Sequence, residues 1–115
     1  MAFIQLTEDP SWVPDTCTLP TTEQPLRVSE LDELFRTGVT ALERLGPTSL
    51  GLTLRPEPRI AAATATLAAR EVHCCSFFTF TLTIDANGLQ LTVDVPPAHA
   101  DVLDALAHRA AAPLS

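Results

Sequence analysis

Apolar and polar residues alternate along the segment "FFTFTLTI" from its second residue, Phe78, onward. Phe78, Phe80, Leu82 and Ile84 share one side of the pattern, and threonines occupy the other. This period of two residues is typical of a half-buried β-strand. The following Asn87-Gly88 is the preferred dipeptide of a two-residue hairpin turn. The pattern therefore predicts an antiparallel hairpin that pairs Ile84 with Leu91, Leu82 with Val93 and Phe80 with Val95.

Helical spacing of apolar residues predicts three helices. The first begins at the capping pattern "SELD" at Ser29 and ends at Gly46-Pro47. The second begins with Pro58 in its first turn and covers residues 58–75, and the third covers residues 98–112. Its inward residues are Val102, Leu103 and Leu106, and its two histidines, His99 and His108, are expected at the surface. Between the first two helices, "SLGLTLR" alternates like a strand that buries Leu50, Leu52 and Leu54.

Four prolines in residues 1–27 argue against a long helix or a central strand there. We expect an extended N-terminal arm over residues 1–27, with a short strand at Phe3–Thr7 and anchors at Trp12 and Val13. Residues 28–115 then form a single α+β domain. Its fold is a small three- or four-stranded mixed sheet with helices packed on one face, ferredoxin-like in part. The sheet face left open favours a homodimer.

Composition and charge exclude several classes of function. The 115 residues include 14 acidic and 7 basic side chains, for a net charge of −7. All seven basic residues are arginines. Nucleic-acid binding requires clustered basic residues, so DNA and RNA are not expected partners. The N-terminus lacks the features of a signal peptide, and no apolar run approaches the length of a membrane span. We therefore expect a cytoplasmic protein with no membrane partner.

The three cysteines are the candidate chemistry of the chain. Cys74 and Cys75 follow each other at the end of the second helix, and Cys17 lies in the arm. Helical geometry places Glu71, Cys74 and Cys75 on the core-facing side, whereas His73 points to the opposite side. The cytoplasm keeps thiols reduced, and a disulfide between Cys74 and Cys75 would close a strained ring.

Soft thiolate ligands indicate a soft metal or metalloid ion, with copper(I), mercury(II), zinc and arsenic(III) as candidates. Cys17, Cys74 and Cys75 are the predicted ligands, and Glu71 or Asp15 would assist as a further ligand or a neighbouring carboxylate. No motif for an organic cofactor occurs. A second interpretation remains open, because free cysteine often packs as a small apolar residue. Thiol catalysis without a metal is disfavoured, since a helix C-terminus opposes a thiolate.

Three segments together resemble a family of small, largely uncharacterised bacterial proteins. They are "CTLP" at residues 17–20, "PLRVSELDELF" at residues 25–35 and "CCSFFTFTLT" at residues 74–83. The family carries a Cys-Thr-Leu-Pro element and a Glu-x-x-Cys-Cys-x-Phe-Phe element, which Glu71, Cys74, Cys75, Phe77 and Phe78 match. This resemblance implies a link to heavy-metal resistance. Where proline commonly follows the cysteine pair, this chain has Ser76.

A weaker likeness is to the alkylmercury lyases, which cleave a carbon–mercury bond with two cysteines and an acidic residue. Their cysteine and phenylalanine elements are spaced differently, and this chain is much shorter. The likeness implies a thiol- or metal-dependent enzyme as an alternative to simple metal binding. A third alternative is an interaction module whose cysteines are purely structural.

Overall fold

The computed structural model describes the backbone of residues 24–114 and the side chains of residues 29–114 other than Cys74. The elements, in chain order, are α1 (Gln24–Gly38), β1 (Val39–Gly46), β2 (Ser49–Leu54), α2 (Pro58–Cys74), β3 (Thr79–Asp85), β4 (Gly88–Asp94), the 3₁₀ turn η3 (Pro97–His99), α3 (Ala100–Ala111) and the 3₁₀ turn η4 (Ala112–Leu114). The strand expected at Phe3–Thr7 and the anchors Trp12 and Val13 lie outside the described residues.

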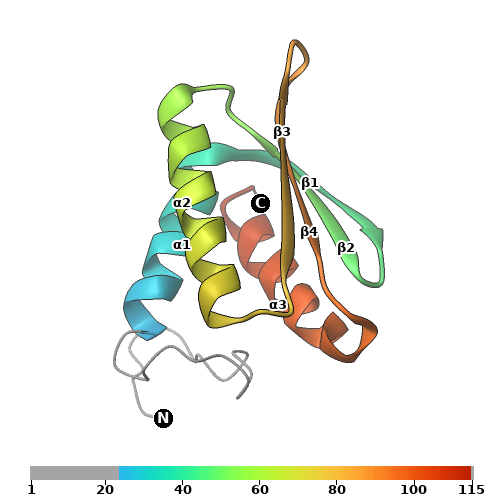
Figure 1. The fold of residues 1–115 in the computed structure, drawn as a ribbon. Helices are drawn as coiled ribbons and strands as arrows, with labels where there is room; N and C mark the ends of the chain where they lie inside the picture. The colour runs from blue at the N-terminus through green and yellow to red at the C-terminus, as the bar shows by residue number, and fades with distance from the viewer. Residues whose placement is uncertain (1–23, 115) are drawn as a thin grey trace.

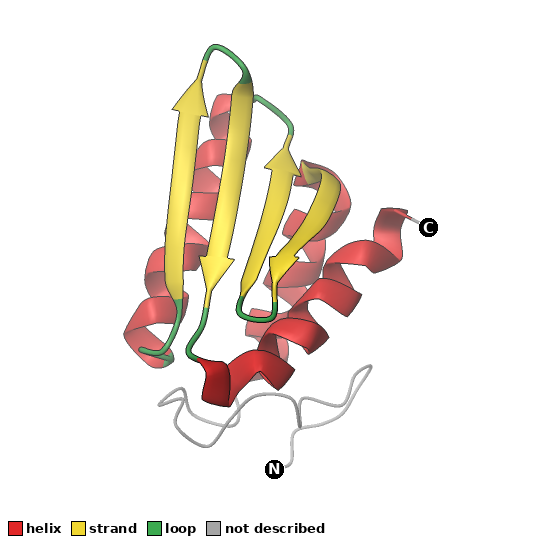
Figure 2. Cartoon of the chain, turned by 90° about the vertical axis from the view of Figure 1, so that its right-hand side faces the viewer, coloured by secondary structure: helices red, strands yellow, loops and turns green. Residues whose placement is uncertain are grey.

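The described residues form an α+β fold, as the sequence predicts. Four strands make one sheet in the order β1-β2-β4-β3, and the helices cover one face of it (Figures 1 and 2). Every neighbouring pair of strands is antiparallel, so the expectation of a mixed sheet is wrong. The reason is that β4 lies between β2 and β3, the two strands that α2 connects. The unit from β2 to α3 is similar to part of a ferredoxin-like fold, and β1 adds the strand beside β2.

Residues 39–46 form strand β1, whereas their leucine spacing predicted a continuation of the first helix. Gly38 ends α1, and the β-branched residues Val39 and Thr40 begin the strand, which suits their restricted side-chain torsions. The Pro47-Thr48 turn then returns the chain, so that Leu42 pairs with Leu52 of β2. Helix α1 also begins at Gln24, so residues 24–27 are helical and do not belong to an extended arm.

The hairpin of β3 and β4 forms, but its register differs from the prediction by two residues. Asp85 pairs with Gly88, Ile84 with Leu89 and Leu82 with Leu91. The two loop residues are therefore Ala86 and Asn87, and the Asn87 N–H donates to the Asp85 carboxylate over 2.8 Å. Gly88 adopts a φ of 125°, which favours glycine. A shift of two residues keeps every side chain on its predicted face.

The core lies between the sheet and the helices. Leu50 and Leu103 are completely buried, and Leu52 and Leu54 are nearly so, which confirms the inward face predicted for β2. Val102 and Leu106 are also buried, which confirms the inward face of α3. None of the described helices is long and apolar enough to span a membrane.

Candidate functional site at the cysteine end of α2

Helix α2 carries the cysteine pair to one end of the molecule. The helix begins with Pro58 in its first turn and ends at Cys74. At the next residue, Cys75, the backbone leaves the helical region, and its N–H donates to the Glu71 carbonyl over 2.6 Å. The Phe78 N–H then donates to the Cys75 carbonyl over 3.3 Å. These two hydrogen bonds fix the reversal that leads from α2 into β3.

Cys75 is a core residue. Only 4% of its surface is exposed, and it belongs to the same buried cluster as Phe78. Its sulfur is engaged in a disulfide bond. The other two cysteines of the chain, Cys17 and Cys74, are outside the described side chains. Cys75 thus differs from the expectation of a reduced thiol.

Glu71 lies on the inward side of α2, as helical geometry predicts. It is half-buried and lines a cavity of about 30 Å³ that also contacts Thr64 and Phe80. Thr64 is almost completely buried, and its hydroxyl has no hydrogen-bond partner among the described residues. His73, by contrast, is exposed, so it does not join Glu71 and Cys75 in the interior.

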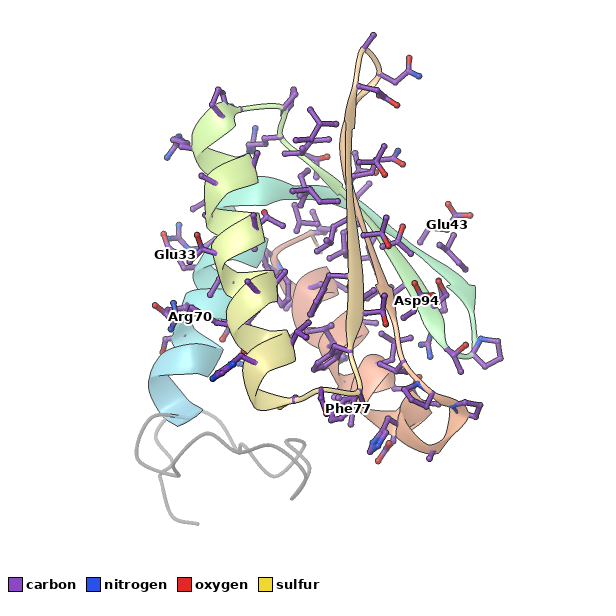
Figure 3. The ribbon with its side chains drawn as sticks, viewed as in Figure 1. Glu33, Glu43, Arg70, Phe77 and Asp94 are labelled. Carbon is purple, nitrogen blue, oxygen red and sulfur yellow. The ribbon has the colours of Figure 1, made fainter. Side chains whose placement is uncertain are left out.

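A stack of Phe77 and His99 lies next to the reversal between α2 and β3. The two ring centres are 4.1 Å apart and the planes meet at 14°. Phe77 also contacts Phe78, with 4.6 Å between ring centres. Figure 3 labels Phe77 at the end of the molecule where the chain enters β3, close to the start of α3. His99 is therefore half-buried rather than a surface residue, and no local pattern in the sequence signals this contact.

Only part of the predicted metal site lies among the described side chains. Among the described residues, no group of three His, Cys, Asp or Glu side chains is arranged to hold a metal ion. Cys17, Asp15 and the side chain of Cys74 lie outside the described part of the chain. Cys75 and Glu71 are the two predicted site residues that can be placed, and both face the interior. The three-cysteine site stays a prediction.

A separate groove of about 760 Å³ runs between α1 and α2. Arg70 of α2 crosses it to form an ion pair with Glu30 of α1, with 2.6 Å between nitrogen and oxygen. Figure 3 shows Glu33 and Arg70 on this helical side of the molecule. Neither Glu71 nor Cys75 lines the groove, so it is distinct from the cysteine end.

Comparison of the chain with protein-family models, with curated proteins and with solved structures finds no match in any of the three.

Proposed function

We propose that the protein, reduced in the cytoplasm, binds a soft metal or metalloid ion through Cys17, Cys74 and Cys75. One observation carries the proposal: the Cys75 sulfur is bonded to a second sulfur. Two thiolates that share a zinc ion at about 2.3 Å each are at most about 4.6 Å apart. Two sulfurs able to form a bond of about 2.05 Å are already closer than that. Reduction would therefore leave two neighbouring thiols available to one ion.

The surroundings of Cys75 support a thiolate–metal bond. Water and competing ligands have little access to a sulfur in a residue that is 4% exposed. Glu71 lies one helical turn earlier and is half-buried on the same side of α2. Its carboxylate would serve as a further ligand for zinc or as a neighbouring charge, and Asp15 is the other candidate. Copper(I), mercury(II) and arsenic(III) require thiolates alone.

The same disulfide favours a second candidate function, in which the cysteines are structural. A buried disulfide stabilises a fold mainly by restricting the unfolded chain. In that case the reduced protein would be less stable but would bind no soft ion. A third alternative, an enzyme resembling the alkylmercury lyases, would be supported by catalytic turnover that Cys→Ser substitutions abolish.

Metal titration of the reduced protein tests the proposal. The protein is treated with a phosphine reductant and titrated with copper(I), mercury(II), zinc(II) or arsenic(III), in competition with a chelator of known affinity. We expect Cys17→Ser, Cys74→Ser and Cys75→Ser each to weaken binding at least about tenfold, which corresponds to about 1.4 kcal/mol. His73→Gln is the matched control, because this exposed side chain adjoins the cysteine pair without facing the interior.

Two results would contradict the proposal. The first is a reduced wild-type protein whose dissociation constant for each of the four ions is above about 1 μM, which corresponds to a binding free energy of about −8.2 kcal/mol. The second is a Cys17→Ser variant with unchanged affinity, which would remove the third ligand. Peptide mapping by mass spectrometry without reductant identifies the disulfide partner of Cys75. Loss of stability on reduction without metal affinity would select the structural role.

A further inference from the structure

The two edge strands of the sheet differ in how they are protected against pairing with another chain. Strand β1 has irregular pairing near both ends and carries Glu43 and Arg44. Bulges and charged residues are the usual means by which proteins block an exposed edge. Strand β3 has no bulge, because its pairing with β4 is regular throughout. Its one charged residue, Asp85, lies at the hairpin end, and residues 79–84 contain no charge and no proline.

The free side of β3 presents backbone hydrogen-bonding groups. The loop of Ala86 and Asn87 joins Asp85 to Gly88, and the pair that closes a two-residue hairpin loop exchanges both of its hydrogen bonds. Alternation along the strand then directs the backbone groups of Thr79, Thr81 and Thr83 toward β4. Those of Phe80, Leu82 and Ile84 point to the opposite side. Figure 2 shows β3 as the outermost strand at the left, with no other strand beside it there.

We propose that β3 pairs antiparallel with β3 of a second copy of this chain, about a twofold axis at Thr81. The segment "TFTLT" at residues 79–83 reads almost identically in both directions. Around this axis, Phe80 lies opposite Leu82 of the second copy, and Thr79 lies opposite Thr83. Apolar residues therefore meet apolar residues on one face and threonines meet threonines on the other, which is the requirement for a self-complementary interface.

The exposure of side chains along β3 fits this register. Ile84 is 69% exposed in the single chain, although it belongs to the apolar face. In the proposed pairing it lies opposite Phe78 of the second copy, the residue just before β3. Phe80 and Leu82 pack against the core but remain only partly buried. A second β3 would cover all three side chains and join the two sheets into one of eight strands, four from each copy.

The helix layer does not obstruct this pairing. Helix α2 lies on the β3 side of the layer, with α1 behind it in Figure 1. Its groove side, which includes Ala63 and Arg70, faces α1. At 100° per residue, the opposite side carries Ala61, Ala65 and Val72, none of them charged. The α2 helices of two copies would therefore approach each other through small or apolar side chains.

Charge disfavours the other surface that a second copy could use, the open face of the sheet. The charged side chains on that face include Glu43, Asp85 and Asp94, all acidic, and the strand pairings place no basic residue among them. Figure 3 shows Glu43 and Asp94 on this side of the molecule. Stacking two such faces would bring carboxylates together, whereas the β3 edge is uncharged from Thr79 to Ile84. The edge is therefore the better interface.

Sedimentation velocity of the full chain over a dilution series, in reductant so that intermolecular disulfides do not contribute, tests the proposal. We expect a reversible dimer of the wild type with a dissociation constant in the micromolar range. Thr81→Lys and Thr81→Asp each place two like charges at the axis and should raise that constant at least about tenfold. Mixing the two variants should restore the dimer, because only a residue at the axis meets its own copy.

Thr53→Lys is the matched control. Thr53 is an exposed threonine of the open face, in β2 and away from the edge, so this variant should remain a dimer. If Thr81→Lys fails to fold, as judged by circular dichroism, Ile84→Lys at a largely exposed position provides the same test.

Three outcomes would overturn the proposal. They are a wild type that is monomeric throughout the series, a mixture of the Thr81 variants that stays monomeric, and a Thr53→Lys variant that dissociates as readily as Thr81→Lys. The last would identify the open face as the interface. None depends on metal binding, so this test and that of the proposed function fail separately.

Discussion

Replacing Thr64 by valine should stabilise the protein. Thr64 is 1% exposed in the middle of α2, and its hydroxyl has no hydrogen-bond partner among the described residues. Burying a hydroxyl without a partner costs about 1–3 kcal/mol in proteins. Valine has nearly the same shape and replaces the hydroxyl by a methyl group that suits the apolar surroundings. We therefore expect Thr64→Val to raise the free energy of unfolding by about 1–2 kcal/mol.

Thr66→Val separates the hydroxyl from the properties of the helix. Thr66 lies two residues along the same helix but is exposed in the groove between α1 and α2. Both substitutions exchange one β-branched residue for another, so their effects on helix propensity are similar. The difference between the two variants therefore reports burial of the hydroxyl. Urea denaturation monitored by circular dichroism measures it, and for a domain of this size 1 kcal/mol shifts the thermal midpoint by about 4–8 °C.

A Thr64→Val variant no more stable than Thr66→Val would refute this reasoning. The adjoining cavity of about 30 Å³ then provides the explanation, because it is large enough to hold a water molecule. A water bonded to Thr64 and Glu71 would make the hydroxyl a satisfied group. Its loss would then cost energy instead of relieving a penalty.

Three further substitutions test the packing of the fold. Leu103→Ala empties a completely buried position and should lower the free energy of unfolding by about 2–5 kcal/mol in urea denaturation; Leu114→Ala, at a 42% exposed position, should change it by less than about 0.5 kcal/mol. Gly88→Ala places a side chain at a φ of 125° and should lower the free energy of unfolding by about 1–2 kcal/mol in urea denaturation. Gly46→Ala, where the added methyl group meets open space, should leave it unchanged. Arg109→Lys removes the paired hydrogen bonds to Asp32 and should cost at most about 1 kcal/mol, because Asp32 is 41% exposed. If Arg109→Lys lowered the free energy of unfolding as much as Leu103→Ala, the ion pair between α1 and α3 would behave as a buried ion pair, which contradicts the expectation.

Most of the fold can be predicted from the spacing of apolar and polar residues. The inward faces of β2 and α3 follow directly from residue spacing, since a buried face needs an unbroken apolar set. Helix α2 was likewise predicted from Pro58 to the cysteine pair. These elements are correct because local pattern and tertiary burial agree.

Residues 39–46 show where residue spacing is ambiguous. Leu42 and Leu45 fall at helical spacing from the leucines of α1, yet Leu45 is 52% exposed on a strand. Residues 39–46 form a strand because they pair with β2. A count of helical spacing along one segment does not include this contact with a second segment. The β-branched Val39 and Thr40 after Gly38 were the local signal for a strand.

The hairpin shows a similar division. Alternation fixes which residues of β3 and β4 face the core, but registers that differ by two residues satisfy it equally. The loop geometry selected Ala86 and Asn87 as the connecting residues, with Gly88 at positive φ in the first pair. The Asn87-Gly88 dipeptide alone predicts Gly88 inside the loop.

For the candidate site, the sequence determined the residue types, and helical geometry correctly turned Glu71 and Cys75 inward and His73 outward. Only the tertiary structure brought His99 against Phe77, because the β3–β4 hairpin separates the two residues along the chain. It also decided that β3, rather than β1, is the unprotected edge of the sheet. The pattern along the chain indicates which residues of each strand face the core. It does not indicate which strands lie side by side, because strand order depends on pairing between distant segments.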